Sequence, residues 1–210
     1  MEETEKKVAE ETTVLSGKEK NRVYIKTIAG MGVLTAIVVV LQLMSSVIHF
    51  GPFSITLALT PIIVGGALYG IKGGSWLGLV MGLTVLLSGD ASAFLTVNVP
   101  GTIIVVLCKS TFAGLLASLI YKLLEKKNIY AAVVAAGVVA PVVNTGLFVI
   151  GCMVFFLDTI NEWASGTPAL EFIITGMVGM NFVVELFVNM ALSAVTVTLI
   201  GYAKKMLNNR

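Results

Sequence analysis

The stretch GTIIVVLCKSTFAGLLASLIYKLLEKKNIYAAVVAAGVVAPVVNTGLFVIGC, residues 101–152, decides the fold. It consists of two long apolar runs joined by a short turn that carries Lys122, Lys126 and Lys127. A helix needs about 20 consecutive apolar residues to cross the hydrocarbon core of a bilayer. Both runs exceed that length, so we expect two membrane-crossing helices joined by a turn that lies in water.

The rest of the chain has the same character. Of its 210 residues, 57% are hydrophobic and 12% are charged, and its mean hydropathy is +0.95. Soluble domains are about 45–50% apolar and about 25% charged. Half the usual charge cannot cover a water-facing surface, which excludes a soluble enzyme. The composition also excludes a disordered chain, a collagen and a disulfide scaffold. We therefore predict an all-α membrane protein.

The apolar runs predict a bundle of six transmembrane spans, at about 25–48, 57–71, 74–88, 99–124, 129–156 and 172–203. The second and third spans are near or below the crossing length. A re-entrant hairpin is the alternative there, but Lys72 at their junction needs water, which favours two short crossings. Residues 1–22 have no apolar core of a signal peptide and too little apolar content to pack. We expect a flexible cytoplasmic tail over 1–22 and one six-helix substrate-binding domain over 23–210.

The basic residues orient this bundle. Six spans place both termini on one side, and every Lys and Arg except Lys109 falls on that side. The opposite loops hold His49, Asp90, Asp158, Glu162 and Glu171. Because basic residues gather on the cytoplasmic side of membrane proteins, we expect cytoplasmic termini in a multi-pass protein of the plasma membrane. Trp163, in the last outer loop, is interpreted as an interfacial anchor; the alternative is part of a lid.

The first outer loop reads HFGPFSITLALTP, residues 49–61. From Phe53 to Thr60, apolar residues alternate with small or hydroxyl residues, which is the period of an extended strand. Pro61 also moves Thr60 away from the helical region and suits the first turn of the second span. An extended segment must be covered by protein or by a ligand, because bare strands do not occur in lipid. The alternative is that the second span begins earlier.

Two charged residues lie inside predicted spans. Lys109 lies about nine residues into the fourth span, which at about 1.5 Å per residue is near the middle of a core about 30 Å thick. Glu185 lies in the middle part of the sixth span. Each such charge costs at least about 2.5–3.5 kcal/mol on insertion scales, so ionisable residues in spans usually face the bundle interior and serve a function.

Polar neighbours accompany both residues at helical spacing. The sixth span carries a polar stripe with a period of four, formed by Asn181, Glu185, Asn189 and Ser193. In the fifth span, Pro141 frees a backbone carbonyl close to the amide of Asn144. Few polar groups among apolar walls are typical of a small-molecule pocket, where Lys109 would meet an anionic group of the ligand. The alternatives are a Lys109–Glu185 ion pair with amides between helices, or Lys109 extending towards the cytoplasm.

Motifs for catalysis are missing from the sequence. GGALYGIK, residues 65–72, resembles a phosphate-binding loop only faintly, because Ile71 occupies the lysine position. There is no His-x-x-x-His, no Cys-x-x-Cys and no Ser/His pair at membrane depth, and Cys108 and Cys152 lie in apolar runs as small core residues. We expect no enzyme activity, no cofactor, no metal site and no nucleic-acid partner.

The chain resembles the substrate-binding S components of energy-coupling factor (ECF) vitamin transporters, which are bacterial uptake systems. The motifs that carry the resemblance are HFGPFSITLALTPIIVGGALYGIKGGSWLGLVMGL (49–83), PVVNTGLFVIGC (141–152) and NFVVELFVNMALS (181–193). The resemblance implies a subunit of an ABC-type importer that binds a vitamin from outside. It also implies a coupling transmembrane subunit and two ATPases as partners, which fits the missing phosphate-binding loop.

The resemblance also implies which residues bind. The ligand-binding positions map to Ser54, Thr56, Asn98, Lys109, Asn144, Asn181 and Glu185, and Phe148 adds an aromatic ring. Few aromatic residues, several hydroxyls and amides and one lysine favour pantothenate, with riboflavin or another vitamin as the alternative. The partner-docking face maps to the small-residue stripe Ala29, Gly32 and Ala36, which could instead pack within the bundle. The alternative functions are a self-sufficient secondary transporter that uses Glu185 as its ion or proton site, and a structural membrane protein.

Overall fold

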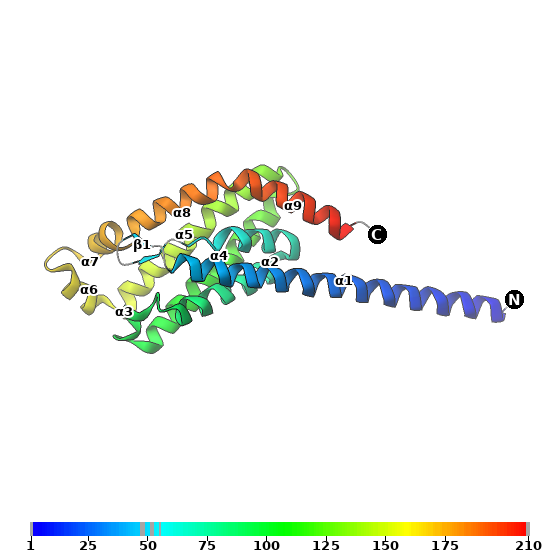
Figure 1. Cartoon of the computed structure of the whole chain (residues 1–210), viewed down its shortest axis with the longest axis horizontal. Coiled ribbons are helices and arrows are strands. Elements are labelled where there is room, and N and C mark those ends of the chain that lie inside the picture. The colour runs from blue at the N-terminus through cyan, green and yellow to red at the C-terminus, as the bar shows by residue number, and fades with distance from the viewer. Residues whose placement is uncertain (1, 47–48, 51–52, 55, 209–210) are drawn as a thin grey trace.

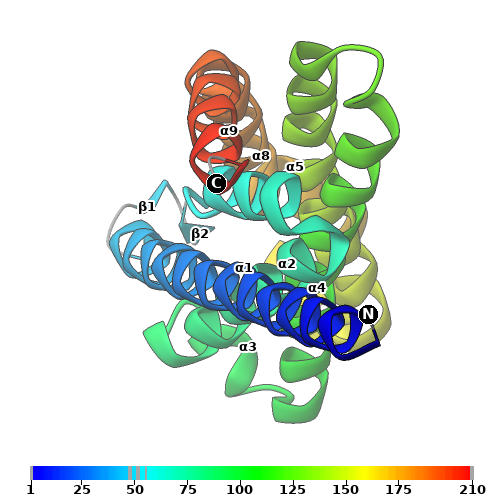
Figure 2. The same ribbon diagram turned by 90° about the vertical axis from the view of Figure 1, so that its right-hand side faces the viewer.

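The structure, a computed structural model, describes the backbone of residues 2–46, 49–50, 53–54 and 56–208. Its elements are α1 (Glu2–Ser45), β1 (His49–Phe50), β2 (Phe53–Ser54), α2 (Leu59–Ser88), α3 (Ser92–Leu95), α4 (Val99–Leu124), α5 (Ile129–Phe155), α6 (Leu157–Ala164), α7 (Ala169–Glu171), the π-helix η1 (Phe172–Val178), α8 (Gly179–Ala191) and α9 (Ser193–Asn208). They form an elongated helical bundle (Figure 1), so the predicted all-α class is confirmed. Both chain ends lie at the same end of the bundle, nearest the viewer in Figure 2.

The first helix is longer than the sequence predicts. The backbone of residues 2–22 is helical, where we expected a flexible arm. Residues 2–16 contain neither Gly nor Pro and include five Glu and two Lys, which are strong helix formers. In Figure 1 this part of α1 extends beyond the bundle. The division of the chain at residue 22 stays a prediction.

The number of crossings is not settled at six. Within the described residues, four helical stretches are long and apolar enough to cross a membrane: Asn21–Ser45, Leu59–Ser88, Val99–Leu124 and Ile129–Phe155. Ala169–Val178 and Asn181–Ala191, bent by 46°, together make a fifth. Six crossings and cytoplasmic termini therefore stay predictions.

The predicted second and third spans are the two arms of α2. Gly70, with φ 73° and ψ −168°, breaks the helix in a region that glycine adopts without steric cost. The arms pack against each other, because a Cβ at Gly65 would collide with the side chain of Leu77 across the break. Residues 59–69 and 71–88 thus form a helical hairpin, so α2 is long enough in total length but is not one straight crossing. At about 1.5 Å per residue the first arm is about 16 Å long, roughly half the thickness of the hydrocarbon core.

The loop before α2 is extended over a shorter stretch than predicted. β1 and β2 pair antiparallel, with His49 opposite Ser54 and Phe50 opposite Phe53. A turn at Leu57 and Ala58 follows, and α2 begins at Leu59. The alternation from 53 to 60 therefore ends early, since Leu59 and Thr60 are already helical. Ile55 lies outside the described residues.

Small residues let α2 and α4 approach closely. The seam has a period of four on both helices: Gly74, Gly78 and Gly82 on α2, and Ser110, Gly114 and Ser118 on α4. A Cβ at Gly78 would collide with the backbone oxygen of Ser110. Seams of small residues are typical of helix pairs in membranes. This seam fixes the position of α4, and with it the position of Lys109.

The end of the bundle that holds the termini is tied by one polar cluster. Lys204 Nζ, near the end of α9, donates to Glu125 Oε2 at 2.7 Å and to the Tyr121 hydroxyl at 3.2 Å. Burial lowers the pKa of Lys204, but the hydrogen bonds to Glu125 and Tyr121 raise it more, so the net pKa shift is upward. The C-terminal helix is thereby held beside the turn between α4 and α5.

Candidate binding site

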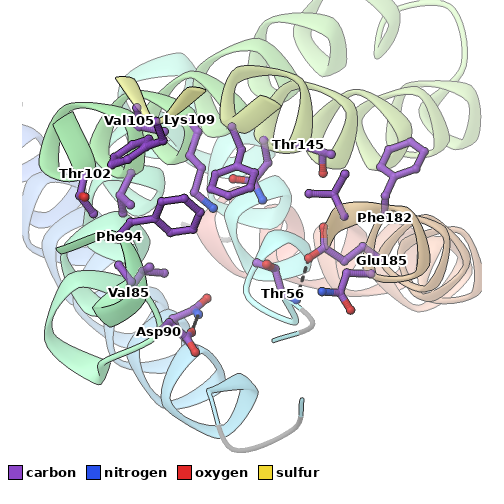
Figure 3. A pocket seen from close by; sticks show the side chains of 18 residues that line it. Thr56, Val85, Asp90, Phe94, Thr102, Val105, Lys109, Thr145, Phe182 and Glu185 are labelled. Atoms are coloured by element: carbon purple, nitrogen blue, oxygen red, sulfur yellow. Dashed lines mark hydrogen bonds between the residues drawn. The ribbon is translucent and has the colours of Figure 1, made fainter. Parts of the chain in front are cut away.

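A cavity lies towards the end of the bundle opposite the termini (Figure 3). Its empty volume is about 780 Å³, part of which is open to solvent. The lining residues come from elements far apart in the sequence: Gln42, Thr56, Val85, Asp90, Ala91, Phe94, Thr102, Val105, Val106, Lys109, Asn144, Thr145, Phe148, Phe156, Val178, Asn181, Phe182 and Glu185. Its mixture of apolar walls and few polar groups is that of small-molecule sites.

Lys109 and Glu185 lie on opposite sides of this cavity (Figure 3). Lys109 Nζ, from α4, lies 5.3 Å from the centroid of the Phe148 ring, in a cation–π contact. Glu185 Oε1, from α8, accepts a hydrogen bond of 2.8 Å from the backbone N–H of Thr56. No ion pair within 4.0 Å joins the two side chains in the described part of the chain. The proposed internal ion pair is therefore not formed.

The polar stripe of the sixth predicted span has divided roles. Asn181 and Glu185 line the cavity, whereas Asn189 Oδ1 accepts from Thr60 Oγ1 at 3.2 Å, and Asn189 Nδ2 donates to the backbone oxygen of Glu185 at 2.8 Å. Ser193 Oγ donates to the backbone oxygen of Met190 at 2.7 Å and takes no part in the site. Only the half of the stripe nearest the cavity is therefore available to a ligand.

Several buried polar atoms around the cavity have no hydrogen-bond partner in the protein. They are Gln42 Oε1, Asn144 Oδ1, Asn181 Oδ1, Asn181 Nδ2 and Glu185 Oε2, and one further such atom among the described residues, Ser110 Oγ, lies in the helix seam. The side chains of Asn144, Asn181 and Glu185 are 4%, 7% and 4% exposed. Native proteins rarely leave buried polar groups unpaired, because each costs about 1–3 kcal/mol. Their concentration around one cavity indicates a site for a polar ligand.

A π-helix directs α8 into the cavity. η1 ends at Val178, and the helix direction changes by 46° between Ala169–Val178 and Asn181–Ala191. A Cβ at Gly179 would collide with the carbonyl oxygen of Ile174, so glycine is needed at this junction. Short π segments frequently mark functional sites. Here the segment precedes Asn181 and Glu185, which both line the cavity.

The structure brings together most of the residues that the sequence singles out. Thr56, Lys109, Asn144, Phe148, Asn181 and Glu185 all line the cavity. Asn98 does not line it, because its side chain caps α4 by accepting from the N–H of Gly101 at 2.9 Å. Ser54 belongs to β2, but its side chain lies outside the described residues. The ligand-binding role of these residues stays a prediction.

Sequence reasoning missed several lining residues. Gln42 lies at the end of α1, and its Nε2 donates to Asp90 Oδ2 at 3.2 Å. The expectation of few aromatic residues is also wrong, since four phenylalanines line the cavity: Phe94, Phe148, Phe156 and Phe182. They come from α3, α5, the residue after α5, and α8, and only the tertiary fold gathers them. No metal-binding cluster of three His, Cys, Asp or Glu residues occurs among the described residues.

The small-residue stripe of α1 lies on the outside of the bundle. Ala29, Gly32 and Ala36 are all exposed, and a Cβ at Gly32 would meet no atom within 4 Å. Packing of this stripe inside the bundle, the alternative considered above, is therefore not observed.

Comparison with known proteins assigns the class. The family model of the ECF transporter substrate-specific component matches residues 26–201, so the chain belongs to this family of transporter subunits. The solved structure of ThiT from Listeria monocytogenes is similar, with a TM-score of 0.64 and 18% sequence identity over 88% of this chain and 98% of that one. At this identity the likeness concerns the fold alone. No curated protein sequence matches the chain.

Proposed function

We propose that this chain binds a vitamin from outside the cell in the cavity described above. It then delivers the vitamin inward together with a coupling transmembrane subunit and two ATPase subunits. The proposal rests on one observation, the five unpaired buried polar atoms that surround the cavity. A ligand that supplies their partners removes a penalty of about 1–3 kcal/mol for each atom.

Pantothenate is the ligand we favour. It is small and flexible and carries a carboxylate, two hydroxyls and an amide. Lys109 Nζ supplies a positive charge for the carboxylate, because charge-assisted hydrogen bonds are stronger than neutral ones. The amides of Asn144 and Asn181 and the carboxylate of Glu185 supply partners for the hydroxyls and for the amide.

The four phenylalanines favour a second candidate ligand, a vitamin with a flat ring such as riboflavin. Aromatic side chains bind rings by offset or edge-on contacts. Phe94, however, already has edge-on contacts with Phe148 at 5.6 Å and Phe156 at 4.9 Å between ring centroids. Because Phe148 and Phe156 already make edge-on contacts with the Phe94 ring, we favour pantothenate over a vitamin with a flat ring.

The partner-docking proposal is supported by the exposure of Ala29, Gly32 and Ala36. Small residues permit close approach of a second membrane helix. The same helix, α1, ends at Ser45 and also carries Gln42, which lines the cavity. Docking on α1 would therefore take place on the helix that also contributes to the binding site.

The proposal is tested by mass spectrometry of small molecules that co-purify with the protein, followed by equilibrium titration with a panel of vitamins. We expect one vitamin to bind with sub-micromolar affinity. Absence of binding by folded protein would contradict the proposal. Gradient-driven uptake by liposomes that contain this chain alone would favour instead a secondary transporter that uses Glu185.

A further inference from the structure

Most of the unpaired atoms around the cavity are hydrogen-bond acceptors. Four are acceptor oxygens, on Gln42, Asn144, Asn181 and Glu185, and one is the donor nitrogen of Asn181. Each amide oxygen, and each oxygen of an ionised carboxylate, can accept a hydrogen bond but cannot donate one. A ligand that satisfies them must present several O–H or N–H groups to the cavity.

The cavity also contains one strong hydrogen-bond donor, the side chain of Lys109. Lys109 Nζ carries up to three N–H donors, and it lies over the face of the Phe148 ring. Asp90 and Glu185 also line the cavity, so both carboxyl groups repel an anionic ligand, which Lys109 attracts. The charges therefore define one orientation for an anion.

We propose that the cavity recognises its ligand at two ends. Lys109 binds a carboxylate, and Glu185 Oε2 on the opposite side binds a hydroxyl or N–H group, so both residues determine specificity. This inference rests on the proposed function and deepens it. The ligand class is a carboxylate whose far end is rich in hydrogen-bond donors.

The two oxygens of Glu185 have separate partners. Oε1 accepts from the backbone N–H of Thr56 at 2.8 Å, and Oε2 is buried without a partner. In Glu185→Gln, the amide oxygen still accepts from Thr56, but an NH2 group replaces the free acceptor. The variant therefore removes the acceptor for the ligand and keeps the contact to the loop.

The experiment is calorimetric titration of the purified full-length chain with pantothenate and with panthenol, in which an alcohol replaces the carboxylate. We expect the wild type to prefer pantothenate by at least about tenfold, the effect of one charge-assisted hydrogen bond. Lys109→Met should bind both compounds equally. Glu185→Gln should weaken both by about tenfold and keep their ratio. Lys204→Met and Glu125→Gln, the same changes at the other end of the bundle, should bind as the wild type does.

The outcomes separate this inference from the proposed function. Binding with an unchanged preference in folded Lys109→Met, or in Lys109→Gln if the first variant misfolds, overturns the inference. So does co-purification of a vitamin without a carboxylate, such as the cationic thiamine, although the proposed function then stands. If another carboxylate vitamin binds, its amide replaces panthenol as the probe. A wild type that binds no vitamin contradicts the proposed function and this inference with it.

Discussion

At the scale of single residues, the cavity is lined by buried polar side chains with atoms that have no hydrogen-bond partner in the described part of the protein. Neither amide atom of Asn181 has a partner, whereas Asn189, two turns further along α8, bonds with Thr60 and with the backbone oxygen of Glu185. The two asparagines belong to the same stripe and differ only in their surroundings. An unpaired buried residue such as Asn181 therefore costs stability in the ligand-free protein.

Asn181→Leu should raise the stability of the ligand-free protein by about 1 kcal/mol or more, because it removes an unpaired buried amide. It should also weaken vitamin binding. Thermal unfolding in detergent measures the first effect, and titration measures the second. Asn189→Leu is the control and should lower stability, since it breaks two hydrogen bonds. Equal destabilisation by both variants would contradict the argument.

The sequence predicts some of these residues for a physical reason. A charge such as Lys109 or Glu185 cannot face lipid cheaply, so its direction follows from its depth in the span. Whether the two charges meet depends on the rotation and separation of α4 and α8, which local patterns do not determine. Asn98 shows the opposite case, because an asparagine before Pro100 serves equally well as a helix cap.

At the scale of elements, hydrophobic periodicity predicts α4 and α5 to within one residue, since long apolar runs end at polar turns. It does not predict the π-helix or the bend before α8, which depend on hydrogen bonding within the folded chain. The glycine content of α2 is visible in the sequence, but its partner helix is not. The seam with α4 becomes evident only when Gly78 is seen against Ser110.

Gly78→Ala should destabilise the bundle by several kcal/mol, because the added methyl group would push α2 away from the backbone of α4. Gly201→Ala in α9, where a Cβ meets no atom within 4 Å, should instead stabilise by about 0.5–1 kcal/mol. Midpoints of thermal unfolding compare the two variants. Equal stability of both would show that the seam is not close-packed.

At the scale of the whole molecule, the candidate binding site and the proposed docking face share α1 but lie on different parts of its surface. Gln42 is 1% exposed and lines the cavity, whereas Ala36 is exposed on the outside. This separation makes it feasible to disrupt one function and spare the other. Neither the exposure of the stripe nor its distance from the cavity lining follows from the spacing of small residues alone.

Ala36→Trp should block assembly with the coupling subunit and abolish uptake, because a bulky ring prevents close helix approach. Vitamin binding by the isolated chain should be unchanged. Co-purification with the partner subunits and uptake into vesicles measure the first effect. Val195→Trp, at an exposed position of α9, is the matched control and should assemble normally. Normal uptake by Ala36→Trp would exclude this face as the docking site.

The aromatic cluster at the cavity contains a tryptophan, Trp163, whose intrinsic fluorescence is expected to report ligand binding. The chain has two tryptophans, and the Trp163 ring lies 5.6 Å from that of Phe94, which lines the cavity. The other, Trp76, lies near α1, where its Nε1 donates to Thr35 Oγ1 at 3.2 Å. In Trp76→Phe, the remaining emission should shift or change in intensity as a vitamin enters and displaces Phe94. Vitamin binding by a single detergent-solubilised subunit would then be followed in real time without any attached dye.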